Sequence, residues 1–414
     1  MGSSNNLRIL ILSFWTPPIL RPRAIMIGKI VKEMVRQKIE PIIVTFDTCG
    51  KWDIDLPIYT ISPFYSKKNI LFKVPLIKNI QTNLREFLYY KQILRQVEKI
   101  IKKHKINVVF SFSNPQSSNI LGAKIRKKLK IPFISYFSDP WSDNPYNKFS
   151  FLQNLKTKFL EKFVIRWSDK IGFTNNEALS LVMKKYPYRW QSKAVVIPHC
   201  FDSNDYPKKT ELENTKFTIS HTGAFYKKRT PEALFMAVRK MRDIEPLTLS
   251  KIKITLVGGT LGYTDYTENN LKELVKKYQL ENVVETLPPV SYGESLKTMS
   301  NSDLLVVIDA DLEKSPFLPS KVVDYAGSGT NIIGITPKGS PTTKFLQNAG
   351  FISFDYSEIN KLESFLRETV NKKIEYNSNL GFLKNYRSDY VVKQLLVHMQ
   401  YLVHNKKSNK RKGD

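Results

Sequence analysis

Cysteine and histidine are scarce in this chain. Its 414 residues include two cysteines, Cys49 and Cys200, and five histidines. Two cysteines form at most one disulfide, and neither a C-x-x-C nor an H-x-x-x-H spacing occurs, which argues against a disulfide-stapled fold and against a zinc site of the usual kind. We therefore expect a reducing, cytoplasmic setting and no bound metal.

Phosphate-binding signatures and long hydrophobic runs are missing as well. Neither G-x-x-x-x-G-K-[ST] nor G-x-G-x-x-G occurs, so the sequence has no P-loop and no dinucleotide fingerprint. The apolar run at residues 9–15 is far shorter than the about 20 residues that cross a membrane. Because Pro17 and Pro18 follow it without a small-residue cleavage site, we interpret it as a buried strand rather than a secretory signal.

Acidic residues are few. The chain has 37 of them against 65 lysines and arginines, for a formal net charge of +28 at pH 7. Such a charge attracts polyanions, including nucleic acid, anionic lipid and diphosphate groups. A composition rich in Lys, Ile and Asn gives the same charge without a dedicated ligand, and both interpretations stay open. No nucleic-acid-binding module is recognisable, so we expect no nucleic-acid partner.

The chain does contain a regular alternation of short apolar runs and amphipathic helical stretches. This pattern is typical of parallel α/β sheets, and 414 residues are too many for one ordinary core. A polar stretch at residues 203–216 separates two such α/β series. We predict a first domain over 1–203, a second over 204–380, a helix over 381–404 that returns to the first domain, and a basic disordered tail over 405–414.

Residues 315–329 carry the clearest sign of a ligand site. A predicted strand at 303–308 leads into a loop with two prolines and then into a helix from Lys321, for which Ser320 is the expected N-cap. Free N–H groups at a helix N-terminus, together with the Lys321 charge, suit a diphosphate. Asp324, one turn later, is placed to reach ribose hydroxyls. An ordinary α/β turn with a structural lysine is the alternative.

A second candidate lies at residues 221–231, H-T-G-A-F-Y-K-K-R-T-P. Gly223 lets the backbone approach a ligand closely, and three cations ending at Arg229 precede a predicted helix. Anion binding and a solvated basic turn both explain this pattern. In the first domain, Asp139 follows a predicted strand. It is a candidate for orienting an acceptor hydroxyl or contacting the donor sugar, or it is a plain turn residue.

Taken together, these segments resemble the retaining GT-B glycosyltransferases of family four. The resemblance rests on S-F-W-T-P-P at 13–18, I-P-H-C-F-D at 197–202, residues 221–231, and P-S-K-V-V-D-Y-A-G-S-G at 319–329. It implies two Rossmann-like domains that face a central cleft, with the donor bound by the second. The implied donor is a nucleotide-diphosphate sugar, with UDP as the default base, and no further cofactor is required.

The resemblance also implies residue roles. Arg229 and Lys321 would neutralise the diphosphate leaving group, with Gly223 and Ser320 lining the donor site. Asp324 matches the second acid of the family's pair of glutamates and would hold the ribose. The position of the first acid is occupied by Pro316, so backbone groups of Phe317 and Leu318 would contact the sugar instead. Asp139, Arg229 and Lys321 are the predicted catalytic residues.

The expected function is therefore sugar transfer, with retention, to a cell-surface polysaccharide or a lipid-linked oligosaccharide. Residues 67–80 and 148–167 mix aromatic and aliphatic side chains with cations, which suits an interface with an anionic membrane. Core-facing helices explain the same pattern. A nucleic-acid-binding protein and a catalytically silent sugar-nucleotide-binding protein are the alternative functions.

Overall fold

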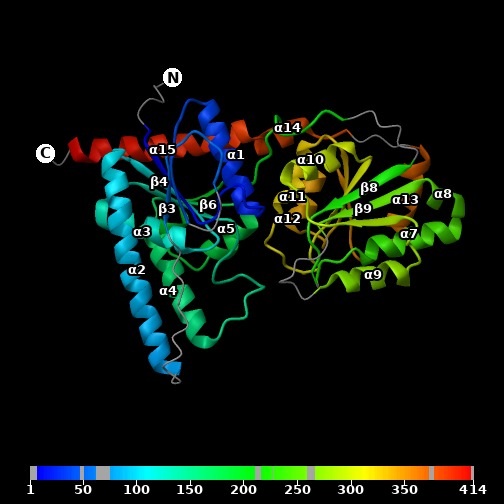
Figure 1. Ribbon diagram of the computed structural model, residues 1–414, viewed down its shortest axis with the longest axis horizontal. Helices are drawn as coiled ribbons and strands as arrows, with labels where there is room; N and C mark the ends of the chain where they lie inside the picture. The colour runs from blue at the N-terminus through cyan, green and yellow to red at the C-terminus, as the bar shows by residue number, and fades with distance from the viewer. Residues whose placement is uncertain are drawn as a thin grey trace. The chain divides into compact units, whose positions relative to one another are not determined.

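The computed structural model describes residues 7–46, 51–61, 75–209, 216–226, 228–258, 266–372 and 377–411. The chain divides into two compact units. Unit 1 comprises Met1–Pro198 together with Val391–Asp414, and unit 2 comprises His199–Tyr390. Each unit is an α/β layer structure with its own parallel sheet (Figure 1).

Unit 1 contains a seven-stranded sheet in the order β3-β2-β1-β4-β5-β6-β7, and its strand pairs are parallel. Strands such as β1 are buried along their whole length, which explains their uninterrupted apolar sequences. The strands are β1 (Ile9–Ser13), β2 (Ile42–Phe46), β3 (Ile58–Ile61), β4 (Val108–Phe112), β5 (Phe133–Phe137), β6 (Lys170–Phe173) and β7 (Ala194–Val196). The helices are α1 (Pro22–Arg36), α2 (Pro75–Lys103), α3 (Ser117–Leu129), α4 (Phe151–Trp167), α5 (Asn176–Met183), α6 (Tyr188–Gln191) and α15 (Ser388–Arg411).

Unit 2 contains a six-stranded sheet in the order β10-β9-β8-β11-β12-β13, again with parallel pairs. The strands are β8 (Phe217–Thr222), β9 (Ile252–Val257), β10 (Val284–Leu287), β11 (Leu304–Ile308), β12 (Asn331–Ile335) and β13 (Ile352–Phe354). The helices are α7 (Glu232–Ile244), α8 (Pro246–Ser250), α9 (Glu268–Lys277), α10 (Tyr292–Asn301), α11 (Ser320–Gly327), α12 (Pro341–Asn348), α13 (Ile359–Lys372), α14 (Leu380–Leu383) and the 3-10 helix η2 (Lys384–Tyr386).

The two α/β series predicted from the sequence are confirmed. The C-terminal helix spans Ser388–Arg411 rather than 381–404, so it continues into the stretch that was predicted to be a disordered tail. α15 begins at Ser388, and from Val391 onward it belongs to unit 1, with Val392, Leu395 and Met399 fully buried. The chain enters and leaves unit 2 side by side: the Phe201 N–H donates to the Tyr386 carbonyl at 2.9 Å, and the Ser388 N–H donates to the Phe201 carbonyl at 2.8 Å. In the described part of the chain, no helix is long and apolar enough to cross a membrane.

Candidate functional site

The site in unit 2 begins with the strand order. β8 is followed in sequence by β9 on one side, and its neighbour on the other side is β11, so the connections leave the sheet in opposite directions between β8 and β11. Open parallel sheets bind ligands beyond the carboxyl ends of their strands at such a switch point. The loop after β8 carries Gly223 and Arg229, and the loop after β11 leads to Lys321. Both sequence-predicted segments therefore meet at this point.

Tyr325 fixes helix α11 against the end of β8. Its side chain is fully buried, and its hydroxyl accepts a hydrogen bond from the Thr222 N–H at 2.7 Å and donates to the Thr222 carbonyl at 3.3 Å. Burial raises the pKa of Tyr325 to about 12, so the hydroxyl stays protonated at neutral pH. This contact holds α11 beside the end of β8, and the Lys321 side chain lies against Gly223 in the loop after β8.

Lys321 is hydrogen-bonded to a buried histidine. The Nδ1 atom of His221 lies 2.8 Å from the Val306 carbonyl, which accepts only, so Nδ1 carries the proton. Nε2 is then an acceptor, and the Lys321 Nζ atom lies 3.1 Å from it. Burial lowers the pKa of His221 well below its usual value, and the Lys321 charge lowers it further. A neutral His221 therefore orients Lys321 without neutralising it.

The backbone conformation of Gly223 favours glycine, and the Lys321 side chain lies where a Cβ atom would be. Its φ of +129° is a conformation that residues with a side chain rarely adopt, and a Cβ there would lie 2.6 Å from the Lys321 Nζ atom. Lys321 thus crosses directly over Gly223. The predicted close approach at Gly223 is present, and the group that approaches in the structure is the Lys321 ammonium.

Arg229 is held by an acid that sequence reasoning did not select. Its Nη2 atom lies 3.2 Å from the Asp309 Oδ1 atom, and the two side chains are 12% and 1% exposed. Asp309 follows β11 and also accepts from the Thr342 hydroxyl at 2.6 Å. The Arg229 guanidinium lies over the Tyr226 ring, 4.8 Å from its centroid. These contacts fix a guanidinium fork at the carboxyl edge of the sheet.

The cluster carries more positive than negative charge. Burial lowers the pKa of Lys321 well below its usual value of 10.5, and the nearby Arg229 lowers it further, although Asp309 opposes the shift. The buried carboxylate of Asp309 pairs with Arg229 and acts on Lys321 only through its charge. A diphosphate brought to this point would supply the missing negative charge and raise the pKa of Lys321 again. The arrangement therefore favours a dianionic ligand.

Asp324 is buried on the next turn of α11. Its side chain is 5% exposed, and its Oδ1 atom accepts from the Tyr292 hydroxyl at 3.2 Å. The Tyr206 hydroxyl donates to the Asp324 carbonyl at 2.7 Å. Burial raises the pKa of both tyrosines, and the Asp324 charge raises it further. Tyr292 therefore orients the carboxylate that the sequence assigned to ribose.

Three other predicted donor residues lie just before Lys321. The Phe317 N–H donates to the Ser315 hydroxyl at 3.4 Å, and the Leu318 side chain packs in the unit 2 core. The N-cap prediction for Ser320 was wrong. Pro319 occupies that position with an extended backbone, and Ser320 is the first helical residue. The restricted φ of proline favours that extended conformation, so α11 begins one residue earlier than expected.

Asp139 lies in unit 1, where it follows β5 and pairs with Arg23 from the first turn of α1. Arg23 also donates to the neighbouring Ser138 hydroxyl at 3.1 Å. Lys321 and Arg229 belong to unit 2, so a role for Asp139 in the same catalytic site stays a prediction. Trp141 packs against the unit 1 core.

Sequence reasoning missed His221, Tyr292 and Asp309 as supporting residues. The signal for Asp309 was present, since an acid directly after a buried strand lies at the carboxyl edge of a parallel sheet. Nothing in the sequence pattern pairs Asp309 with Arg229, eighty residues earlier. In the described part of the chain, no group of His, Cys, Asp and Glu side chains is arranged to hold a metal ion.

No family model and no curated protein matches the sequence. Solved structures match its fold over nearly the whole chain. Anabaena HepE in complex with UDP matches 97% of this chain and 100% of its own, with a TM-score of 0.64 and 12% identity. The lipopolysaccharide outer core galactosyltransferase WaaB matches the same shares, with a TM-score of 0.59 and 11% identity. A Listeria monocytogenes structure named as a UDP-N-acetylglucosamine 2-epimerase matches 97% of both chains, with a TM-score of 0.60 and 11% identity.

The chain has the GT-B fold. Identities this low show the fold alone, and a protein named as an epimerase shares it with a galactosyltransferase. The fold alone therefore does not decide between sugar transfer and epimerisation. The residues at the switch point of unit 2 carry the rest of the argument.

Proposed function

We propose that this GT-B protein is a glycosyltransferase that uses a nucleotide-diphosphate sugar, with UDP as the nucleotide. The observation that carries the proposal is the partly buried pair of cations, Lys321 and Arg229, which the loops after β11 and β8 bring to the carboxyl edge of the sheet. UDP bound in the HepE structure supports this choice of nucleotide. Sugar transfer needs stabilisation of charge on the departing diphosphate more than it needs a nucleophile.

In the proposed reaction, Lys321 and Arg229 contact the diphosphate as its bond to the anomeric carbon breaks. Both cations are held before the donor arrives, Lys321 by His221 and Arg229 by Asp309, so little reorganisation is needed. The acceptor oxygen attacks the anomeric carbon, and its proton passes to the leaving phosphate. We propose attack on the same face, hence retention, as in family four. Asp324 contacts the ribose, and Phe317 and Leu318 the sugar.

A thermal-shift screen of UDP, GDP and ADP tests the nucleotide site. UDP at 100 times its dissociation constant is expected to raise the apparent stability by about 2.7 kcal/mol. Asp324→Ala is expected to remove most of that gain, whereas Asp311→Ala, at an exposed acid near the site, leaves it unchanged. Stabilisation by generic DNA and by no nucleotide would favour the nucleic-acid alternative.

A transfer assay distinguishes the proposed glycosyltransferase activity from epimerisation and from nucleotide binding without catalysis. Labelled UDP-sugar and a glycan acceptor should give a labelled glycan and UDP. Epimerised UDP-sugar formed without acceptor would assign the activity named for the Listeria structure instead. Tight UDP binding with neither product would point to the catalytically silent alternative.

The acceptor is proposed to be a polysaccharide or a lipid-linked oligosaccharide, reached from the inner face of an anionic membrane. Helix α4 supports membrane docking, because it leaves large apolar side chains in solvent: Phe151 is 75%, Leu152 66% and Phe159 70% exposed. Cations alternate with them along the helix. The other proposed stretch, residues 67–80, lies outside the described side chains.

Vesicle flotation at low salt tests this docking. The full chain is expected to float with anionic vesicles and not with neutral ones. Phe151→Ser together with Phe159→Ser should reduce the floating fraction at least about tenfold, since each ring buries a large apolar area in the interface. Leu88→Ser, at an exposed position of α2, is the control. Equal flotation of both variants would contradict docking through α4.

A further inference from the structure

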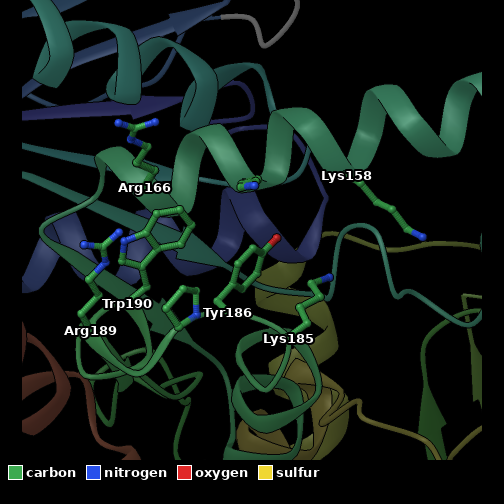
Figure 2. Close-up of a pocket in the computed structure, with 8 residues that line it drawn as sticks. Lys158, Arg166, Lys185, Tyr186, Arg189 and Trp190 are labelled. Carbon is green, nitrogen blue, oxygen red and sulfur yellow. The ribbon is translucent and has the colours of Figure 1, made fainter.

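Unit 1 contains a pocket between α4 and the segment that follows α5, with a volume of about 540 Å³. Its lining is dominated by cations and aromatic rings. Figure 2 shows α4 along one side of the pocket, with the Tyr186 and Trp190 rings rising towards it from the opposite segment. The cations that line it are Lys158, Lys162, Arg166, Lys185 and Arg189.

Only Lys185 has its charge balanced within the described residues. It pairs with Asp143 and, at 2.7 Å, with Glu161, a fully buried carboxylate that also accepts from the Tyr186 hydroxyl at 2.7 Å. These contacts hold Lys185 and Tyr186, two residues of the lining, in place. No described carboxylate pairs with the other four cations, Lys158, Lys162, Arg166 and Arg189. The pocket therefore holds an excess of positive charge on a rigid frame.

The cations of α4 are spaced so that their like charges lie on the same face of the helix. Lys158, Lys162 and Arg166 are four residues apart, which places them on one helix face, and like charges at this spacing destabilise a helix. Lys193 follows α6, and its side chain donates to the Arg166 carbonyl at 3.1 Å. Burial lowers the pKa of Lys193, Asp169 opposes this shift, and nearby Arg126 and Arg189 lower the pKa further. Natural proteins tend to break such local rules at functional or strained sites.

The same face of α4 changes character along its length. Phe151 and Leu155, 75% and 50% exposed, precede Lys158, Lys162 and Arg166 at spacings of three or four residues. An apolar half is thus followed by a cationic half. Arginine forks match the oxygens of a phosphate group, and lysines add charge without directional demand. A ligand that fits both halves has a hydrocarbon chain ending in a phosphate.

We propose that this pocket binds the phosphate or diphosphate group of an amphiphilic acceptor, with its hydrocarbon chain along Phe151 and Leu155. The inference rests on the proposed function only in calling the ligand an acceptor, because binding itself requires no transfer activity. It goes beyond general attraction to an anionic surface, since it names a bounded site with two arginines and two unbalanced lysines. The phosphate is recognised in the pocket whether it is free or carried by a chain, and the chain adds affinity.

Calorimetric titration of the full chain tests the inference with three probes: dodecyl phosphate below its micelle concentration, inorganic pyrophosphate, and uncharged dodecyl maltoside. Dodecyl phosphate is expected to bind about tenfold more tightly than either of the others. Lys162→Gln with Arg189→Gln should weaken it at least about tenfold, because two charged contacts are lost. Lys99→Gln with Lys102→Gln, on exposed positions of α2, should change it less than about twofold.

Three results would overturn the inference: unchanged dodecyl phosphate binding in the pocket variant, equal losses in the α2 control, or pyrophosphate binding as tight as that of dodecyl phosphate. Because Lys162 and Arg189 lie in unit 1, an unchanged melting temperature of the ligand-free variant is the folding check, and UDP-induced stabilisation tests the proposed function separately. If UDP stabilises both proteins and the pocket variant still binds dodecyl phosphate, this inference alone fails. If UDP stabilises neither protein and the pocket variant loses dodecyl phosphate, the proposed function fails and the pocket stands.

Discussion

Replacing Lys321 with methionine should reduce sugar transfer about 100- to 1,000-fold, the usual effect of removing one preorganised group that stabilises developing negative charge. The same change should leave the melting temperature of the ligand-free protein unchanged or raise it. Burial makes the Lys321 charge unfavourable in the free protein, and methionine fills similar space without a charge. Initial rates with UDP-sugar and thermal unfolding without ligand measure the two effects.

The pair of readouts separates a functional lysine from a structural one. A structural lysine would lose stability along with activity when replaced. Lys297→Met, at an exposed position of α10, is the matched control and should alter neither property. A Lys321 variant that is destabilised yet binds UDP normally would show that the site has been assigned to the wrong residue.

The pH dependence of UDP binding reports on the same group. The pKa of Lys321 lies below 10.5 in the free protein, and a bound diphosphate raises it, so binding takes up a proton in the window between the two values. UDP affinity should therefore fall as pH rises through that window. In the free protein the unfolded chain binds more protons than the folded one there, so this group makes stability rise with pH towards 10.5. Titrations in buffers of different ionisation enthalpy detect the proton uptake, which Lys321→Met should abolish.

Replacing Asp309 with alanine should lower the free energy of unfolding by roughly 3 kcal/mol, because the change leaves Arg229 charged and largely buried without its partner. It also removes the acceptor of the Thr342 hydroxyl. For a unit of this size the loss corresponds to a fall in melting temperature of about 6–12 °C. Asp311→Ala, two residues away and exposed, should stay within about 0.5 kcal/mol.

A double substitution identifies the cause of that loss. Asp309→Ala combined with Arg229→Met removes the unpaired charge and should recover a large part of the stability, while UDP binding is lost. Coupling between two contacting sites typically amounts to about 0.5–3 kcal/mol. Strictly additive losses would mean that Asp309 supports the fold through Thr342 and its own backbone rather than through Arg229.

The fold was largely predictable because parallel α/β units leave a clear pattern in the sequence. Fully buried strands such as β1 and β11 are continuous apolar runs. Helices α12 and α13 and strand β13 were not predicted. β13 has only three residues, one of them exposed, so its apolar pattern is too short to detect.

The candidate site was predicted only in outline. Lys321 and Gly223 were found because each stands next to a turn with a clear local signature. The partners that hold the site together, such as Asp309 for Arg229, come from elements far apart in sequence, and their pairing depends on strand order. Local spacing also misplaced the start of α11, because the backbone geometry of Pro319 decided which residue caps the helix.

The hydrogen bonds that join Phe201 to Tyr386 and Ser388 bear on whether unit 2 can be moved as one segment of the chain. They bring the two ends of unit 2 together, so residues 199–390 form an insert whose borders already meet. Segments with adjacent ends are the ones that tolerate transplantation and circular permutation. Unit 2 is thus a cassette whose two connections to unit 1 lie side by side.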